Sequence, residues 1–256
     1  MLAFVVPLKS RRVSNDWNYV SQLFERTLRS ICAQTSSEFK VIVVHHEKPA
    51  IGFSHPAVTY VPVDYPVPDR RDHPALILDK YRKRLRGFMV AREFSPSHMM
   101  PVDADDCLSR RLAAWVDENS AAPGWYFDIG YFHRDGTRRV FLRRRGFHDW
   151  CGTSRVFRTD LLALPAGDDF DDAGVAAFRP WQLTTRLAAL PFPGAVYVLG
   201  RRFEGTHSRR NYWADFKENP RVVRWHARKL FDELLHSEPL TPALSAEFGV
   251  YPINDG

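Results

Sequence analysis

Hydrophobic and polar positions in the first 63 residues follow two alternating patterns. Short apolar runs at 3–8, 39–44 and 58–63 are rich in β-branched residues, which is typical of buried strands. Between the first two runs, apolar residues recur every three or four positions, which predicts a helix over 17–33. A strand, a helix and a second buried strand predict a βαβ unit with parallel strands and a right-handed crossover.

Further along the chain, the pattern predicts another helix over 76–94, and this helix carries many basic residues. A brief apolar run at 99–102 predicts a strand. Ser109 is a candidate cap for a further helix that extends to about Asn119.

The second half begins with a hairpin signal. Asp135-Gly136 lies between the apolar segments 124–133 and 138–143, and this dipeptide is typical of tight turns between antiparallel strands. A strand at 195–199 and a long helix over 212–235, kinked at Pro220, complete the pattern. The predicted fold class is therefore α/β, with a sheet that is parallel at its start and mixed afterwards.

Composition narrows the class of protein only slightly. The chain has 256 residues, 45% of them hydrophobic, which is enough for one substantial core. Three scattered cysteines argue against a disulfide framework, so we expect a reducing, cytoplasmic setting. No apolar window predicts a membrane span. The net charge of +6 suits anionic partners but is equally compatible with solubility alone.

Three carboxylates follow the strand predicted at 99–102: Asp103, Asp105 and Asp106. Ligands of open α/β sheets bind beyond the carboxyl ends of strands. In an extended segment Asp103 and Asp105 point the same way, and they repel each other unless a cation lies between them. Oxygen ligands favour Mg²⁺ or Mn²⁺. This predicts a divalent metal held by the acidic cluster, with a simple turn or helix cap as the alternative interpretation.

Four segments together resemble a known family. They read Phe4-Val-Val-Pro-Leu, Phe24-Glu-Arg-Thr-Leu-Arg-Ser-Ile-Cys-Ala-Gln-Thr, Phe39-Lys-Val-Ile-Val-Val and Pro101-Val-Asp-Ala-Asp-Asp. The arrangement resembles the GT-A fold of nucleotide-sugar glycosyltransferases, especially the family 2-like group, over roughly residues 3–210. The resemblance implies a GT-A catalytic domain over 1–212, with a Rossmann-like mixed sheet and helices on both faces. A helical extension over 213–256 would then pack on that domain.

The resemblance also implies roles for particular residues. Asp105 would bind Mn²⁺ or Mg²⁺, with Asp106 as a neighbour, and Asp103 would lie near the ribose or nucleotide of the donor. The other expected contacts of the nucleotide sugar are Leu8, Lys9, Glu47, Lys80 and Arg209. Glu47 is a substitute here, because relatives usually have acidic residues where this chain has His45-His46-Glu47.

A C-terminal segment, Gly205-Thr-His-Ser-Arg-Arg-Asn, resembles the "His, small residue, Asn" segment of metal-dependent GT-A enzymes. His207 would complete the metal coordination or contact the diphosphate, and an ordinary surface histidine is the alternative. Arg209 and Arg210 would add positive charge, since guanidinium groups match phosphate oxygens.

The expected catalytic base is missing from its usual place. Inverting relatives have Glu-Asp before a "Trp-x-Leu-x-x-Arg-Leu" helix, but here Arg179-Pro180 precedes Trp181-Gln-Leu-Thr-Thr-Arg-Leu. Asp169 and Asp172 are the replacement candidates, beside Asp168 and Asp171, although the group also reads as a solvated acidic loop. Asp149 is a further candidate, because it begins a segment that resembles the acceptor side of the family.

These observations predict a metal-dependent glycosyltransferase that uses a nucleotide-diphosphate sugar and an acceptor of unknown kind, a sugar, a lipid-linked group or another. The alternative is an inactive nucleotide-sugar-binding relative without a base. Arginines at 138–139 and 143–145 are either solvated or bind an anionic acceptor or a membrane surface peripherally. No nucleic-acid motif is present, so no nucleic-acid partner is expected. A nucleotidyltransferase is disfavoured, because the first strand is not followed by a glycine-rich loop.

Overall fold

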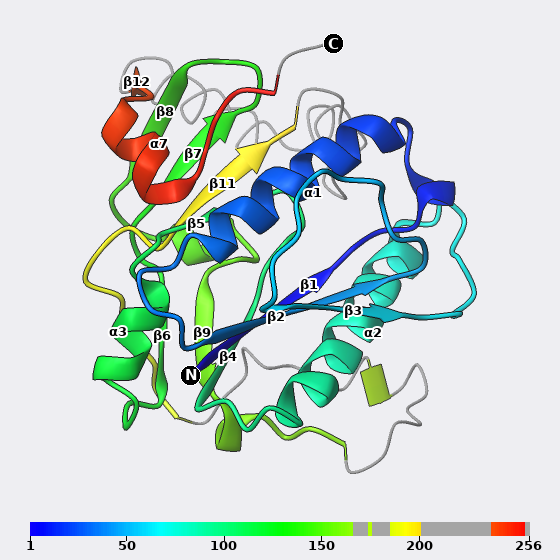
Figure 1. Ribbon diagram of the computed structural model, residues 1–256, viewed down its shortest axis with the longest axis horizontal. Helices are drawn as coiled ribbons and strands as arrows, with labels where there is room; N and C mark the ends of the chain where they lie inside the picture. The colour runs from blue at the N-terminus through cyan, green and yellow to red at the C-terminus, as the bar shows by residue number, and fades with distance from the viewer. Residues whose placement is uncertain (166–173, 176–184, 201–236, 254–256) are drawn as a thin grey trace, which may run out of the picture.

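The computed structural model describes residues 1–165, 174–175, 185–200 and 237–253 (Figure 1). Its larger sheet has seven strands in the spatial order β10 (Ala188–Ala189), β6 (Gly124–Tyr126), β9 (Arg155–Arg158), β4 (His98–Pro101), β1 (Leu2–Pro7), β2 (Phe39–His45) and β3 (Val58–Pro62). Strands β1 to β4 are mutually parallel, whereas β9 runs antiparallel to both β4 and β6. The predicted mixed sheet with a parallel start is confirmed.

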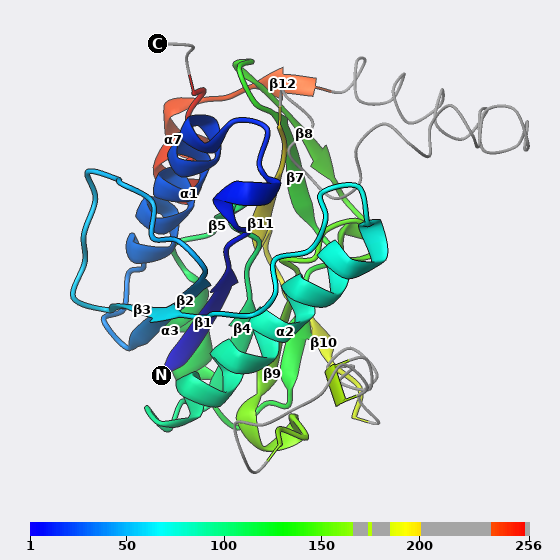
Figure 2. The ribbon, with the colours of Figure 1, turned by 90° about the vertical axis from the view of Figure 1, so that its right-hand side faces the viewer.

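Helices cover both faces of this sheet. Successive side chains of β1 point to opposite faces, so each face presents apolar side chains to a helix. Phe4 and Val6 pack toward α1 (Trp17–Cys32) and α3 (Leu112–Glu118), whereas Val5 packs toward α2 (His73–Arg92). Figure 2 shows α1 and α2 on opposite sides of β1. The α/β class with helices on both faces is therefore also confirmed.

The smaller sheet has five strands in the order β12 (Ser237–Pro239), β8 (Arg139–Arg143), β7 (Gly130–Arg134), β11 (Ala195–Leu199) and β5 (Cys107–Leu108). Strands β7 and β8 form the predicted hairpin, and Gly136 in its turn has a φ of +80°. Such a φ favours glycine. Three short 3-10 helices lie elsewhere, at Arg11–Val13 (η1), Phe147–Asp149 (η2) and Thr159–Leu161 (η3).

One predicted strand is wrong. The segment 124–133 is not continuous: 124–126 is β6 of the larger sheet, and 130–134 begins the smaller one. The chain changes sheets at Phe127, whose ring is fully buried and whose backbone N–H donates to Ser154 O. The aromatic ring of Phe147 lies 2.6 Å from where a Cβ of Gly130 would be, so only glycine fits at the start of the second strand.

Two helix starts differ from the prediction for local reasons. Helix α2 begins at His73 because the Asp72 carboxylate caps it, accepting a hydrogen bond from Ala75 N at 3.0 Å. Helix α3 begins at Leu112, and its N-cap residue Arg111 makes no side-chain cap; the Ser109 hydroxyl donates to Glu247 and accepts from Arg111 N at 3.3 Å. The helix predicted over 212–235, including Pro220, lies outside the described residues.

The described C-terminal segment returns to the start of the chain. Strand β12 pairs antiparallel with β8, and α7 (Pro242–Phe248) lies beside α1 (Figure 1). The Ser30 hydroxyl donates to Phe248 O at 2.6 Å. The boundary expected at residue 212 lies outside the described residues and stays a prediction. Among the described residues, no helix has both the length and the apolar character that crossing a bilayer requires.

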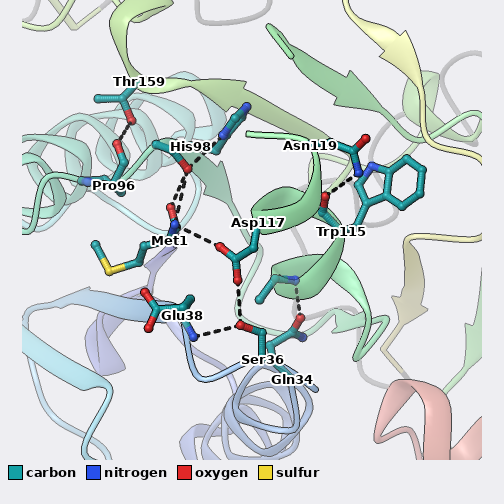
Figure 3. A network of polar contacts seen from close by, with 12 residues as sticks. Met1, Gln34, Ser36, Glu38, Pro96, His98, Trp115, Asp117, Asn119 and Thr159 are labelled. Carbon is teal, nitrogen blue, oxygen red and sulfur yellow. Dashed lines mark hydrogen bonds and ion pairs between the residues drawn. The ribbon is translucent and has the colours of Figure 1, made fainter. Parts of the chain in front are cut away.

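At the amino-terminal edge of the larger sheet, polar contacts tie β1 to neighbouring elements (Figure 3). The Met1 ammonium group lies 3.1 Å from an Asp117 carboxylate oxygen, and the Ser36 hydroxyl donates to the other oxygen. Met1 O accepts a hydrogen bond from the Ser97 hydroxyl. These contacts fix the edge opposite to the one where the carboxyl ends of β1 and β4 lie.

A buried ion pair joins helix α1 to the β7–β8 turn and the C-terminal segment. Arg26 of α1 donates to Asp135 Oδ1 at 2.7 Å and to Tyr251 O at 2.7 Å, and the Tyr19 hydroxyl donates to Asp135 Oδ2. Both charged side chains of the pair have 0% exposure. The pair therefore depends on its own hydrogen bonds and not on water.

We predict that Arg26→Ala lowers the free energy of unfolding by about 3–5 kcal/mol, because it leaves the Asp135 charge buried and unpaired. The matched control is Arg29→Ala on the same helix. Arg29 makes an exposed pair with Glu25, and its loss should cost about 1 kcal/mol or less. Urea unfolding of both variants checks this; equal losses would contradict the structural role of the buried pair.

Candidate functional site

The candidate site lies where the strand order reverses. From β1 the chain moves outward to β2 and β3, and α2 then returns it to β4 on the other side of β1. Ligands of open α/β sheets bind at such a switch point, beyond the carboxyl ends of the strands. Leu8 and Lys9 follow β1 there, and Asp103 and Asp105 follow β4. Four of the predicted site residues are therefore brought to one edge.

Asp103 is held by two cations from α2. Lys80 Nζ lies 2.8 Å and Arg84 Nη2 lies 2.7 Å from its carboxylate oxygens. Its backbone N–H donates to the Thr153 hydroxyl at 2.8 Å. Burial acts to raise the pKa of Asp103, but the charges of Lys80 and Arg84 outweigh burial and hold this pKa well below its usual value. Asp103 is thus a fixed carboxylate.

The cations reach Asp103 because α2 packs unusually close to β1. A Cβ on Gly87 would lie 2.3 Å from Val5 Cγ1, so a larger residue would push the helix away. Lys80 and Arg84 are four residues apart and share one helix face. Between them, buried Lys83 donates to Leu8 O at 2.9 Å and to Asp79 at 2.7 Å.

Lys83 also holds the backbone of Leu8 in place by a hydrogen bond. The Leu8 side chain belongs to the core, with 1% exposure, and its carbonyl oxygen accepts the Lys83 hydrogen bond. The side chain is therefore not available to a ligand at this edge. The half-buried Lys9 comes next in the chain, and its charge acts on the carboxylate of Asp105.

Asp105 is a carboxylate whose surroundings disfavour its charged form. Its side chain is half-buried. Burial and the nearby charge of Asp103 raise its pKa to about 6, against the opposing effects of Lys80 and Lys9. A bound divalent cation would remove this penalty. Mg²⁺ commonly binds through one or two carboxylates together with substrate phosphates, so Asp105 fits such an ion.

Asp106 does not join this site. It is fully buried, with Oδ1 accepting from Val198 N at 3.0 Å and Oδ2 lying 3.4 Å from Cys151 Sγ. Burial raises its pKa well above the usual value. The expectation that all three carboxylates hold one metal is wrong for Asp106, because its side chain points into the core toward β11. No group of three His, Cys, Asp or Glu side chains arranged to hold a metal occurs among the described residues.

Glu47 lies after β2 at the same edge, but its oxygens have intramolecular partners. The Ser10 hydroxyl donates to Oε1 and Arg11 N donates to Oε2, both at 2.9 Å. Burial acts to raise its pKa, and these two hydrogen bonds outweigh burial and lower it. Glu47 thus fixes the loop between β1 and η1, beside the place where we predicted a nucleotide contact.

A cavity of about 270 Å³ adjoins the Asp103 ion pairs. Gly152 separates the two: a Cβ there would lie 2.9 Å from Asp103 Oδ2 and 3.1 Å from Arg84 Nη2, which leaves room for glycine only. The cavity lies between α2, η2 and β9. Its lining consists of Tyr81, Arg84, Pro101, His148, Asp149, Trp150, Cys151, Gly152, Arg155 and Phe157.

The cavity brings together residues that sequence reasoning missed. Tyr81, His148 and Arg155 come from three separate elements, and no local pattern links them. Asp149 was predicted as a base candidate, and its side chain is 69% exposed at the cavity wall. His148 lies beside it, with Nε2 3.5 Å from Asp149 Oδ1 and Nδ1 3.7 Å from Asp128 Oδ1.

Other predicted site residues fall outside the described residues. These are the loop carboxylates and the C-terminal segment: Asp168, Asp169, Asp171, Asp172, His207, Arg209 and Arg210. Their roles stay predictions.

No family model and no curated protein matches the chain. Solved structures do resemble it. S. aureus TarS 1–349 is 13% identical with a TM-score of 0.46, over 77% of this chain and 60% of that one. Its complex with UDP-GlcNAc gives 14% and 0.39, over 87% and 65%. HddC from Yersinia pseudotuberculosis gives 10% and 0.37, over 78% and 90%.

All three TM-scores lie below 0.5. At these identities and TM-scores, the similarity says nothing about the reaction of this chain, which spans only about 60% of TarS 1–349.

Asp103 and Asp105 should affect stability in opposite directions. We predict that Asp103→Asn lowers the free energy of unfolding at pH 8 by about 2 kcal/mol, because Lys80 and Arg84 lose a charged partner. In metal-free buffer, Asp105→Asn should raise it by about 1–2 kcal/mol, since one pKa unit corresponds to about 1.4 kcal/mol and solvent screens part of the effect.

The pH dependence follows from the signs of the two pKa shifts. Asp105 has a raised pKa, so its contribution to stability is complete below its ordinary value of 3.8 and is lost as the pH rises through about 6. The gain from Asp105→Asn should vanish at pH 4. Asp103 has a lowered pKa, so its contribution is present above 3.8 and is lost as the pH falls further. Urea titrations at pH 4 and 8 test the Asp105 effect, and a further titration below about pH 3 tests the loss of the Asp103 contribution. A destabilised Asp105→Asn at pH 8 would contradict this electrostatic account.

Proposed function

We propose that this chain is a glycosyltransferase that moves a sugar from a nucleotide-diphosphate donor to an acceptor hydroxyl, with help from a divalent metal. The observation that carries the proposal is the pair Asp103 and Asp105 at the switch point, with Lys80 and Lys9 beside them. Mixed charge at this edge suits a ligand that has both hydroxyl groups and phosphates. The family resemblance of the Pro101-Val-Asp-Ala-Asp-Asp segment supports the same interpretation.

Asp103 is suited to holding the ribose. Lys80 and Arg84 occupy part of its hydrogen-bonding capacity, but an ionised carboxylate has about four lone-pair positions. Both oxygens can therefore still accept from ribose hydroxyls, and the two ion pairs keep the carboxylate charged and in place. Lys80 has 30% side-chain exposure, so its ammonium group is accessible to the donor phosphates as well.

Asp105 would hold Mn²⁺ or Mg²⁺, with His207 as a second proposed ligand from outside the described residues. When bound, the metal neutralises negative charge on the departing diphosphate. Asp103 and Asp105 supply negative charge at this edge. Lys9 and Lys80 supply positive charge that favours phosphate oxygens.

Asp149 is our proposed base. Its carboxylate is exposed at the cavity wall, where an acceptor hydroxyl has access to it. As the acceptor oxygen bonds to the anomeric carbon, the carboxylate takes the hydroxyl proton. The electron pair of the broken carbon–oxygen bond leaves with the nucleoside diphosphate. Asp169 and Asp172 remain the alternatives from the sequence, and an inactive, donor-binding relative is the alternative function.

We predict that Asp105→Ala abolishes sugar transfer and lowers the affinity for nucleoside diphosphates with Mn²⁺ at least tenfold, while the fold stays intact. Calorimetry with UDP and GDP, beside a donor-hydrolysis assay, measures both effects. Glu118→Gln removes an exposed carboxylate far from this edge in α3 and serves as the control. Unchanged turnover in Asp105→Ala would sink the metal proposal.

We predict that Asp149→Asn lowers kcat by a factor of about 10² or more, because the amide cannot accept a proton. Donor affinity should stay within about twofold, since Asp149 lies outside the switch point. Loss of donor turnover with an unchanged calorimetric affinity for the donor would support Asp149 as the base. If Asp149→Asn keeps full activity and Asp169→Asn or Asp172→Asn does not, the base is in the acidic loop. Donor binding without turnover in the parent protein, across many acceptors, would instead support the binding-only alternative.

A further inference from the structure

Two arginines, Arg84 and Arg155, line the cavity beside Gly152. Arg84 is more than nine-tenths buried and lines it, and although its Nη2 contacts Asp103, its Nε has no hydrogen-bond partner among the described residues. A buried guanidinium N–H without a partner costs free energy unless a ligand or water satisfies it. Since Arg84 lines the cavity, an oxyanion bound there would supply acceptor oxygens to this guanidinium group.

A second guanidinium lies in the same wall. Within the part of the chain that the structure describes, Arg155 of β9 makes one long hydrogen bond, 3.4 Å from Nη1 to His148 O. Burial lowers its pKa, although nearby Asp149 opposes the shift. The ring of His148, on η2, has a buried Nδ1 that lacks a hydrogen-bond partner among the described residues. Arg84 of α2 and Arg155 of β9 thus both line one small space.

The other residues of the cavity wall suit contacts with the hydroxyl groups and the carbon skeleton of a ligand. Trp150 lines the cavity, and the Arg143 guanidinium lies 5.4 Å from its ring centroid. Asp149 supplies an exposed carboxylate that accepts hydrogen bonds from hydroxyls. A volume of about 270 Å³ is at the small end of ligand sites, which begin near ~300 Å³. The ligand is therefore the size of a monosaccharide or smaller.

We propose that this cavity binds an acceptor that carries an oxyanion, a phosphate or a carboxylate, next to its hydroxyl groups. Arg84 and Arg155 hold the oxyanion, since planar guanidinium groups match its oxygens. Trp150 contacts the carbon skeleton, and Asp149 faces the hydroxyl. The identification of this ligand as the sugar acceptor rests on the proposed function. The binding of an oxyanion-bearing polyol can be tested without any sugar donor.

The test is calorimetry on the full chain with three probes: glycerol 3-phosphate, glycerate and glycerol. We expect one or both of the anionic probes to bind at least tenfold more tightly than glycerol, and the better one identifies phosphate or carboxylate. Arg155→Gln should weaken that binding by about tenfold or more. Arg110→Gln removes the same charge from a distant exposed position and should leave it unchanged.

Competition separates this cavity from the donor edge. Inorganic pyrophosphate with Mn²⁺ should not displace the anionic probe. Displacement, equal affinity for glycerol, or unchanged binding in Arg155→Gln would each overturn the inference. The probe comparison and the competition use the parent protein, so they decide the matter even if Arg155→Gln does not fold. Intact oxyanion binding without donor turnover would count against the proposed function only.

Discussion

The constraint on which this molecule depends is the concentration of three carboxylates in four residues, 103–106, at the end of β4. Left in one place, their charges would repel one another strongly. The fold separates them by environment: Asp103 receives two cations from α2, Asp106 is buried against Val198 and Cys151, and Asp105 keeps an elevated pKa. Each carboxylate thus has a different chemical character, and the one with uncompensated charge lies at the edge of the sheet. That charge is what a cation-bearing ligand would neutralise.

Close backbone packing makes this separation possible. Gly87 lets α2 rest directly on β1, so that Lys80 and Arg84 extend past the strand ends to Asp103. Gly152 then leaves space on the other side of the same ion pair. A side chain at Gly87 would push α2 away from β1, and a side chain at Gly152 would press on the Asp103–Arg84 ion pair. The two glycines therefore have an electrostatic consequence, because they set the distance between opposite charges.

The sequence predicts most of the regular elements, because their signals are local. Strand 195–199 and the turn at Asp135-Gly136 are confirmed with the expected bounds. Asp106 could not be separated from Asp105 in this way, since its burial depends on β11, some 90 residues away, whose Val198 N–H it accepts. The break between β6 and β7 also depends on a distant ring, that of Phe147. The cavity needs α2, η2 and β9 together, so no single segment reveals it.

Arg84 links the two halves of the candidate site. Its Nη2 is held by Asp103 at the switch point, where we propose that the nucleotide sugar binds. The same residue lines the cavity on the other side. An oxyanion in the cavity would compete with Asp103 for the same guanidinium group. Asp103 would then depend more on its ion pair with Lys80. A ribose hydroxyl donating to Asp103 would in turn leave Arg84 freer to hold the oxyanion. Because such coupling is reciprocal, each ligand should alter the affinity for the other by the same factor. A shared, buried guanidinium is thus a physical route by which the two proposed ligands would influence each other's binding.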